Sequence, residues 1–164
     1  MTSEESPVYE RLALLGIPFE RFEHPPAATV DDALEHWAGI EATHCKNLFL
    51  RNQKGNRHYL VILEHSKRAD LRAVAAQIGD GKVSFASPAR LATHLGVTPG
   101  SVSPFGLVHD CEHRVRVYLD HDLRGVERIS FHPNINTVTV TLSFTDFEVF
   151  LASCHNQMRY IRVS

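Results

Sequence analysis

Five segments of the chain carry apolar residues at the three- and four-residue spacing of an amphipathic helix. In the third segment, Leu71, Val74 and Ile78 follow this spacing behind Asp70, a residue type that commonly caps a helix. Proline at a first helical position, glycine after a last one, and a capping box from Thr145 to Glu148 set other boundaries. The sequence therefore predicts helices over 6–15, 29–38, 71–78 and 88–95, and a last helix that begins at Thr145.

Short apolar or alternating runs predict strands between these helices. The predicted strands are 19–22, 48–50, 58–63, 82–85, 114–119, 127–131, 138–142 and 159–163. We expect 48–50 and 58–63 to be neighbouring buried strands, 114–119 to be half exposed, and 159–163 to lie at a sheet edge. The order has no regular βαβ period and no G-x-G-x-x-G or P-loop motif, which argues against a doubly wound nucleotide-binding sheet. The prediction is a mixed α/β (α+β) fold, in which about five helices pack around one curved mixed β-sheet.

Composition places the chain among ordinary globular proteins and limits its partners. Its 164 residues, of which 43% are hydrophobic and 22% charged, fit a single domain spanning residues 1–164. The net charge of −2 means that any nucleic-acid contact must come from a local basic patch. Three well-separated cysteines without a C-x-x-C motif, and the lack of a signal sequence, favour reduced thiols in the cytoplasm. No apolar run reaches about 18 residues, so no membrane span is expected.

Lys46 stands at the start of a strongly apolar run, in the segment T-H-C-K-N-L-F-L at 43–50. An ammonium buried without partners costs several kcal/mol, so this side chain either extends to solvent or faces a ligand in a pocket. We favour the pocket. Asn47 beside it adds an amide, and the pair can bind a phosphate, a carbonyl or a carboxylate.

A second candidate is the loop 97–106, which holds two glycines and two prolines and is therefore expected to be ordered but irregular. Its centre reads Gly100, Ser101, Val102, Ser103 and Pro104. Glycine allows close backbone approach, and successive N–H groups in such a turn can form an anion-binding nest. These donors suit the oxyanion of an acyl-transfer intermediate, although a purely structural loop remains the alternative.

A third candidate is His132 in the loop 132–137, where Pro133 holds it extended and Asn134 and Asn136 follow. Eleven histidines occur in the chain, so an ordinary surface or core role is the alternative for any one of them. Because His132 lies between two predicted strands in a loop rich in Pro and Asn, a functional role is as well supported as an ordinary structural one.

Three other features suggest less favoured chemistry. His109, Cys111 and His113 resemble a metal cluster, but in an extended segment the two histidines would lie about 13 Å apart, too far for one zinc ion. We therefore expect no metal and no cofactor. Cys45 is a possible nucleophile, yet on a strand Lys46 would point to the opposite face and would not activate its thiol.

A small basic patch is formed by Lys67, Arg68 and Arg72 around the start of the third predicted helix. A solvated helix face is the default interpretation of such a patch. A contact with an RNA backbone is the alternative.

Four motifs in order resemble one known family. They are H-P-P-A-A-T-V at 24–30, K-N-L-F-L at 46–50, G-S-V-S-P at 100–104 and H-P-N-I-N-T at 132–137. Together they resemble the YbaK/ProX aminoacyl-tRNA deacylases and, among these, the free-standing prolyl-tRNA editing proteins that hydrolyse alanyl-tRNA(Pro). The resemblance covers nearly the whole chain. It implies a barrel-like mixed sheet with the active site in a pocket, and hydrolysis without a metal or a covalent intermediate.

The resemblance also implies roles for single residues. Lys46, Asn47 and His132 would be catalytic, and the substrate would be held by Thr29, Gly100, Ser101, Val102, Ser103, Pro104 and Asn136. Either His132 or the adjacent ribose hydroxyl of the substrate would serve as base. The partner would be the acceptor end of a mischarged tRNA, with prolyl-tRNA synthetase as a candidate helper.

One departure from the family pattern leaves the substrate open. The family often has a larger apolar residue near Ala28, and a wider pocket here would change the amino acid that is removed. Cysteinyl-, seryl- or threonyl-tRNA are therefore alternatives to alanyl-tRNA(Pro), and a non-catalytic tRNA- or synthetase-binding module is another.

Overall fold

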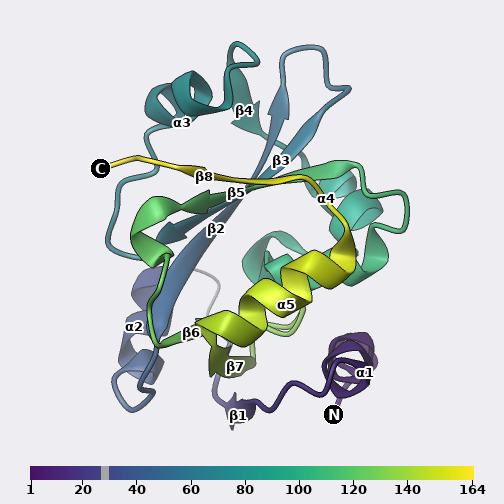
Figure 1. The fold of residues 1–164 in the computed structure, drawn as a ribbon, viewed down its shortest axis with the longest axis vertical. Helices are drawn as coiled ribbons and strands as arrows, with labels where there is room; N and C mark the ends of the chain where they lie inside the picture. The colour runs from purple at the N-terminus through teal and green to yellow at the C-terminus, as the bar shows by residue number, and fades with distance from the viewer. Residues whose placement is uncertain (27–29) are drawn as a thin grey trace.

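The computed structural model describes residues 1–26 and 30–164, which form one eight-stranded mixed sheet with helices around it (Figure 1). The strands are β1 Glu20–Glu23, β2 Thr43–Asn52, β3 His58–Glu64, β4 Val83–Phe85, β5 Val115–Asp120, β6 Arg128–Phe131, β7 Val138–Ser143 and β8 Met158–Ile161. Their order is β1-β7-β6-β2-β3-β5-β8, with β4 paired to β2. The predicted mixed α/β class, the β2–β3 neighbours and the edge position of β8 are confirmed.

Strand β2 joins the two halves of the sheet. Its first residues, Thr43 and His44, pair in parallel with β6, while the stretch from Cys45 to Arg51 pairs antiparallel with β3. On the side away from β3, β2 next pairs with β4 from Leu50 onward. Phe49 O also accepts from Ala86 N–H at 3.0 Å. Among the described residues, positions 45–48 of β2 therefore have no strand partner on this side, and we call them the open edge of β2.

The helices are α1 Ser6–Leu14, α2 Val30–Trp37, α3 Leu71–Ile78, α4 Pro88–Leu95 and α5 Phe144–Cys154, with 3-10 turns η1 Pro99–Ser101, η2 Pro104–His109 and η3 His121–Leu123. The Asp70 carboxylate caps α3, and the Ser87 hydroxyl caps α4. The prediction for α5 was wrong at its start, because Ser143, not Thr145, accepts the capping hydrogen bond from Asp146 N–H. Within the described ranges, no helix is long and apolar enough to cross a membrane.

Two apolar clusters cover opposite sides of β2. The first contains Cys45 and Phe49 together with residues of α1, α4, η2 and α5. The second contains Leu48 and Leu50 with the inner face of α3. Alternate residues of a strand point to opposite faces, so this division shows which way each side chain of β2 points.

Strand β5 is more buried than its alternating pattern predicts. Only Arg116 is partly exposed, and Tyr118 is 4% exposed. The reason is its position between β3 and β8, with the two clusters on either side.

The N-terminal helix is anchored by a buried carboxylate that the sequence did not single out. Glu5, whose side chain is fully buried, accepts hydrogen bonds from Thr2 N–H (2.7 Å) and Tyr9 Oη (2.6 Å) and pairs with Arg21 (2.9 Å). Burial alone would raise the pKa of this carboxyl. The hydrogen bonds from Thr2, Tyr9 and Arg21 outweigh burial and lower the pKa from 4.5 to about 2.

This lowered pKa predicts a loss of stability in acid. Because the folded pKa lies below the unfolded one, Glu5 stabilises the fold above pH 4.5, and this contribution disappears as the pH falls from 4.5 to about 2. We expect Glu5→Gln to lower the free energy of unfolding by about 2 kcal/mol at pH 7 and to flatten the decline between pH 5 and 3. Urea titrations of both proteins at pH 7, 5 and 3 measure the free energy of unfolding. Parallel pH dependences of wild type and Glu5→Gln would contradict the prediction.

Candidate functional site

A small pocket opens where β2 and β6 diverge, and it has about 20 Å³ of space for a water-sized group. It is lined by Trp37, Cys45, Asn47, Ser130, Phe131, His132 and Thr139. The pocket therefore brings together two of the predicted catalytic residues, Asn47 from the open edge of β2 and His132 from the end of β6.

His132 is held in one tautomer by the backbone. Its Nδ1 donates to the Val138 carbonyl oxygen at 2.8 Å, which leaves Nε2 as an unprotonated acceptor. Burial lowers the pKa of His132, the hydrogen bond to Val138 opposes this, and the nearby His24 lowers the pKa further. The ring is therefore neutral at pH 7 and can accept a proton or a hydrogen bond.

Asn47 carries a buried side-chain oxygen at the pocket. Its Oδ1 is buried and makes no hydrogen bond within the described residues. An unsatisfied buried acceptor costs about 1–3 kcal/mol, so such an atom in a pocket is typical of a site that a ligand completes.

Helix α2 closes the other side of this pocket. The Trp37 ring stacks on His44 with 4.3 Å between centroids, and His44 Nδ1 accepts a hydrogen bond from the Ser130 hydroxyl. Burial lowers the pKa of His44 to about 4, although its Nε2 contact with the Ile40 carbonyl opposes the shift. His44 is thus neutral and holds Ser130 in place.

Lys46 is not among the residues that line this pocket. Strand alternation puts it on the face of Leu48 and Leu50, opposite Asn47, and its register partner on β3 is Leu63. It is partly buried, and over the described ranges its ammonium has no hydrogen bond or ion pair. It lies within the open edge of β2, one residue from Asn47.

The loop from Gly100 to Pro104 is ordered, as predicted, and forms two 3-10 turns instead of one nest. The Ser103 hydroxyl, fully buried, accepts from Phe105 N–H and caps the second turn. Ser101 N–H donates to the Thr98 carbonyl. The N–H groups of Val102 and Ser103 are adjacent donors, and neither donates a backbone hydrogen bond to a described residue outside the helices and strands.

Asn134 links this loop to His132. Its Nδ2 donates to the Phe105 carbonyl oxygen at 3.4 Å, while its Oδ1 is buried without a partner among the described residues. Its backbone has φ +67°, a left-handed conformation that asparagine tolerates better than most residues. Asn136, which the sequence analysis assigned to the substrate, is half buried.

Several other predicted residues have defined outcomes. Thr29 lies outside the described residues, as does the start of its predicted helix. The segment from His109 to His113 is a 3-10 turn followed by a tight turn, so the assumption that it is extended was wrong. Among the described residues, no group of three His, Cys, Asp or Glu side chains is arranged to hold a metal ion. Lys67 is not solvated, because its ammonium pairs with Asp120 and Asp122.

The remaining polar contributors, Ser130 and Thr139, were missed because their strands alternate simply and carry no motif. Thr139 Oγ1 lies 2.8 Å from His24 Nε2, and the His24 ring is 5.8 Å from that of His132. Only the pairing of β1 with β7 brings these residues together.

Because the thiol of Cys45 is buried, we predict that it has no chemical role. Burial raises the pKa of Cys45 well above its usual value of 9.0, and the carboxylates of Glu64 and Asp120 raise it further. We expect Cys45→Ala to keep turnover within about twofold while costing about 1 kcal/mol of stability for the lost side chain. Initial rates of the deacylation that the resemblance implies and a thermal melt check this, and loss of all turnover in a folded variant would restore the thiol as a nucleophile.

Comparisons with known proteins agree over most of the chain. A family described as "Aminoacyl-tRNA editing domain" matches residues 24–150. "Prolyl-tRNA editing protein ProX" of Acetoanaerobium sticklandii is 37% identical over 95% of both chains, and "Prolyl-tRNA synthetase associated domain-containing protein 1" of Bos taurus is 35% identical over 87% of this chain and 85% of its own. "Multifunctional Ser/Thr-tRNA deacylase ProXp-y" of Escherichia coli K12 is 29% identical over 67% of this chain and 50% of its own.

A solved structure supports the fold. It is described as a candidate trans-editing enzyme for prolyl tRNA synthetase, and it superposes with a TM-score of 0.74 at 21% identity, covering 100% of this chain and 99% of its own.

Proposed function

This chain belongs to the aminoacyl-tRNA editing domain family, and we propose that it removes alanine from mischarged alanyl-tRNA(Pro) as a free-standing enzyme. The observation that carries the proposal is the pocket between β2 and β6, which brings a neutral His132 together with the Asn47 oxygen that has no partner among the described residues. A pocket of about 20 Å³ has room for one group of the size of a methyl, which favours alanine over the proline ring.

The reaction is hydrolysis of the ester that joins the amino acid to the terminal ribose. This ester is already activated, so the protein needs mainly to position a water and to stabilise the tetrahedral oxyanion. The water oxygen bonds to the carbonyl carbon, the ribose oxygen leaves with a proton, and free alanine and uncharged tRNA result. Either His132 Nε2 or the neighbouring ribose hydroxyl takes the proton from the water.

We assign the oxyanion to the loop that follows α4. The N–H groups of Val102 and Ser103 are adjacent donors without a backbone acceptor among the described residues outside the helices and strands, and Gly100 before them permits close approach of the substrate. Asn134 follows His132 and donates to the Phe105 carbonyl, so it fixes the position of this loop relative to His132. Asn136 and Thr29 complete the proposed substrate contacts.

We assign Lys46 to the terminal phosphate or the developing negative charge. Its place in the open edge of β2 lets a four-carbon side chain bend around the strand toward Asn47. Asn47 fixes the amino acid through hydrogen bonds.

A prolyl site cannot strongly reject a smaller amino acid, because a lost methylene or two is worth only about 1–3 kcal/mol. A second site that is too small for proline removes the error. Such a function places the protein in the cytoplasm with charged tRNA, and prolyl-tRNA synthetase is the partner that supplies its substrate.

The second candidate keeps the reaction and changes the amino acid. The similarity to an Escherichia coli protein named for Ser and Thr deacylation favours seryl- or threonyl-tRNA as alternatives. Asn47 Oδ1 and His132 Nε2 can each accept a hydrogen bond from a side-chain hydroxyl, and the volume of about 20 Å³ favours serine over the larger threonine.

A reconstituted charging reaction tests the proposal. Prolyl-tRNA synthetase supplied with alanine and tRNA(Pro) should accumulate alanyl-tRNA(Pro), and addition of this protein should remove that product while prolyl-tRNA(Pro) made in parallel persists. Unchanged accumulation of alanyl-tRNA(Pro) would reject the proposal, and clearance of seryl-tRNA alone would favour the second candidate.

A further inference from the structure

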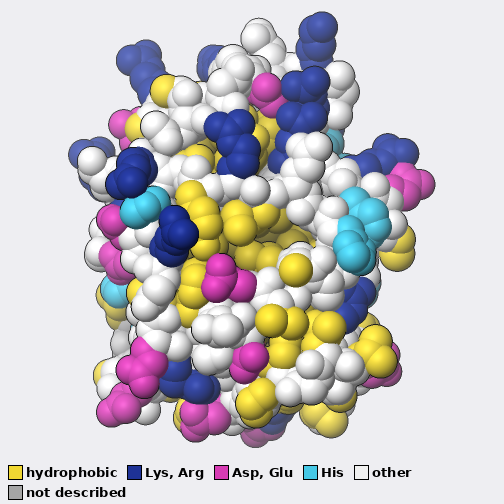
Figure 2. Space-filling model, in the orientation of Figure 1, with side chains coloured by type: hydrophobic (Ala, Val, Ile, Leu, Met, Phe, Trp, Pro, Cys, Tyr) yellow, Lys and Arg dark blue, Asp and Glu magenta, His cyan; other side chains and the backbone are white. Residues whose placement is uncertain are grey.

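Charge is segregated along the chain and over the surface. Residues 46–90 hold nine Lys and Arg against three Asp and Glu, whereas residues 1–45 hold two against nine. Figure 2 shows Lys and Arg concentrated in the upper half of the molecule, over the β2–β3 hairpin, α3 and β8. The net charge of −2 therefore conceals a strongly basic end.

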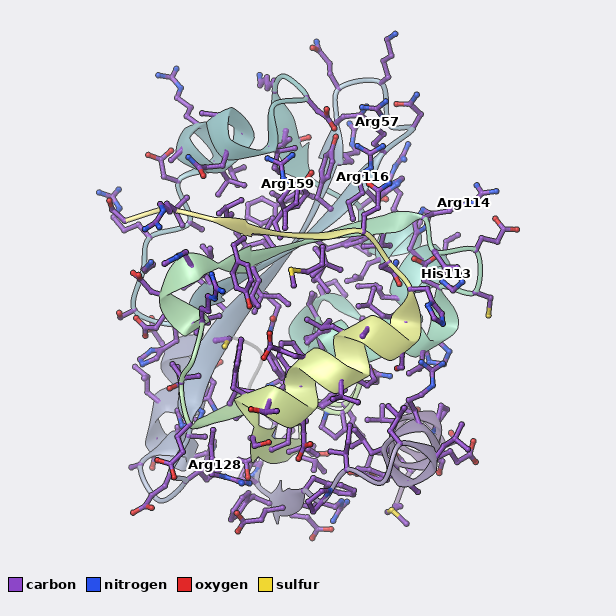
Figure 3. All side chains as sticks on the ribbon, in the orientation of Figure 1. Arg57, His113, Arg114, Arg116, Arg128 and Arg159 are labelled. Carbon is purple, nitrogen blue, oxygen red and sulfur yellow. The ribbon has the colours of Figure 1, made fainter. Side chains whose placement is uncertain are left out.

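Three arginines of this basic end form what we call the arginine row: Arg57, Arg116 and Arg159 (Figure 3). Arg116 precedes the buried Tyr118 by two residues, and Arg159 precedes the buried Ile161 by two, so both lie on the sheet face of the second cluster. Arg159 pairs with Tyr118, two residues beyond Arg116 on the neighbouring strand. Strand spacing and rise then set Arg116 and Arg159 roughly 8 Å apart.

The guanidinium groups of the row are held in place but remain accessible. Asp80 pairs with Arg57 at 3.1 Å and with Arg116 at 3.5 Å, and these side chains keep 47% and 33% of their surface exposed. Arg159 lies over the Tyr118 ring at 5.9 Å, and no carboxylate of the described residues is within salt-bridge distance of it. The row thus loses little side-chain entropy when it binds an anion.

The row shares a sheet face with Lys46. Lys46 precedes Leu48 of the second cluster by two residues. Lys46 of β2 pairs with Leu63 of β3, and Arg116 of β5 pairs with Tyr59 of β3. The two cations are therefore four residues apart along the strands and two strand spacings apart across the sheet. That separation is about 16 Å, a distance that an extended polyanion can span.

We propose that the arginine row binds the sugar–phosphate backbone of the acceptor arm of tRNA while the ester reaches the open edge of β2. This inference rests on the proposed function. Several guanidinium groups close together at one end of the molecule match the repeated phosphates of a nucleic acid, which arginine binds through two parallel hydrogen bonds. A protein partner would need buried aromatic or apolar anchors, and Tyr118 beneath the row is only 4% exposed.

The test uses Arg159→Gln, because Arg159 makes no ion pair with a described residue whose loss would disturb the fold. The matched control is Arg124→Gln, since Arg124 lies over the Tyr160 ring at 5.4 Å, and Tyr160 packs against the first cluster on the opposite face. The probe is an uncharged RNA hairpin that copies the acceptor stem and its single-stranded 3′ end, followed by fluorescence anisotropy between 50 and 200 mM salt. We expect Arg159→Gln to weaken binding about tenfold and to reduce the salt slope by about one, with Arg124→Gln unchanged.

A catalytic measurement separates this proposal from the proposed function. Arg159→Gln should lower kcat/KM for alanyl-tRNA(Pro) and leave hydrolysis of alanyl-adenosine, which has no stem, unaltered. Equal RNA binding by the wild type and both variants would overturn the proposal for the arginine row. Equal weakening of RNA binding in both variants would also overturn it, because it would show an effect of net charge alone. If Arg159→Gln weakened binding to prolyl-tRNA synthetase and left RNA binding unchanged, the proposal would also be overturned. A wild-type protein that hydrolyses no aminoacyl-tRNA but binds RNA through Arg159 would reject the proposed function and keep the row.

Discussion

Lys46→Ala is expected to lower kcat/KM for alanyl-tRNA(Pro) by about 10²–10³-fold, the loss typical when one charge-stabilising donor is removed from an active site. The ammonium has no protein partner among the described residues, so its removal costs the fold little. The kcat should fall more than KM rises if Lys46 stabilises the developing charge, and KM should rise alone if it binds a phosphate. Single-turnover and steady-state deacylation rates distinguish the two.

Two variants control for effects on the fold. Lys46→Met keeps most of the aliphatic stem beside Leu63 and should be as inactive as the alanine variant. Lys54→Ala removes an exposed lysine from the β2–β3 turn and should retain full activity. Wild-type rates in a folded Lys46→Met protein would remove this residue from the mechanism.

Phe105→Ala is expected to destabilise the protein by about 3–5 kcal/mol, a large part of the stability of a domain of this size. The ring is fully buried and contacts Phe131 and Phe150 edge to face, with centroids 5.9 and 5.1 Å away. Its carbonyl also receives the hydrogen bond of Asn134, so the variant loosens the link between the loop and the His132 segment. Chemical denaturation measures the loss, and activity at a temperature where the variant is folded measures the loosening.

The matched control is Phe85→Ala on β4, whose ring is 58% exposed. It should change the free energy of unfolding by no more than about 0.5 kcal/mol. A similar loss in both variants would mean that the first cluster does not carry the stability assigned to it.

Local signals predicted α3 and α4 well because their boundaries have a chemical cause close by in sequence, whereas β2 begins at Thr43, five residues before the predicted strand 48–50. Asp70 and Ser87 cap their helices as expected, and glycine in the left-handed conformation ends both at Gly79 and Gly96. The misplaced start of α5 has the same kind of cause: Ser143 and Thr145 both suit a cap, and only the end of β7 decides between them.

The site was harder to predict because it depends on pairing between distant segments. The two-residue parallel contact of β2 with β6 creates both the pocket and the open edge, and nothing near Thr43 in the sequence announces it. The motif did place Asn47 and His132 in one site. It also placed Lys46 beside them, while strand alternation puts that side chain on the other face. The buried Glu5 and the arginine row were missed for a related reason, since each is assembled from separate elements.

The most direct measurement is the single-turnover release of amino acid from alanyl-tRNA(Pro) and from prolyl-tRNA(Pro) by the purified protein. The proposed pocket predicts that alanine is released at least about 100-fold faster than proline, since proline does not fit beside Asn47 and His132. Equal rates for the two substrates, or no release of alanine, would contradict the central claim.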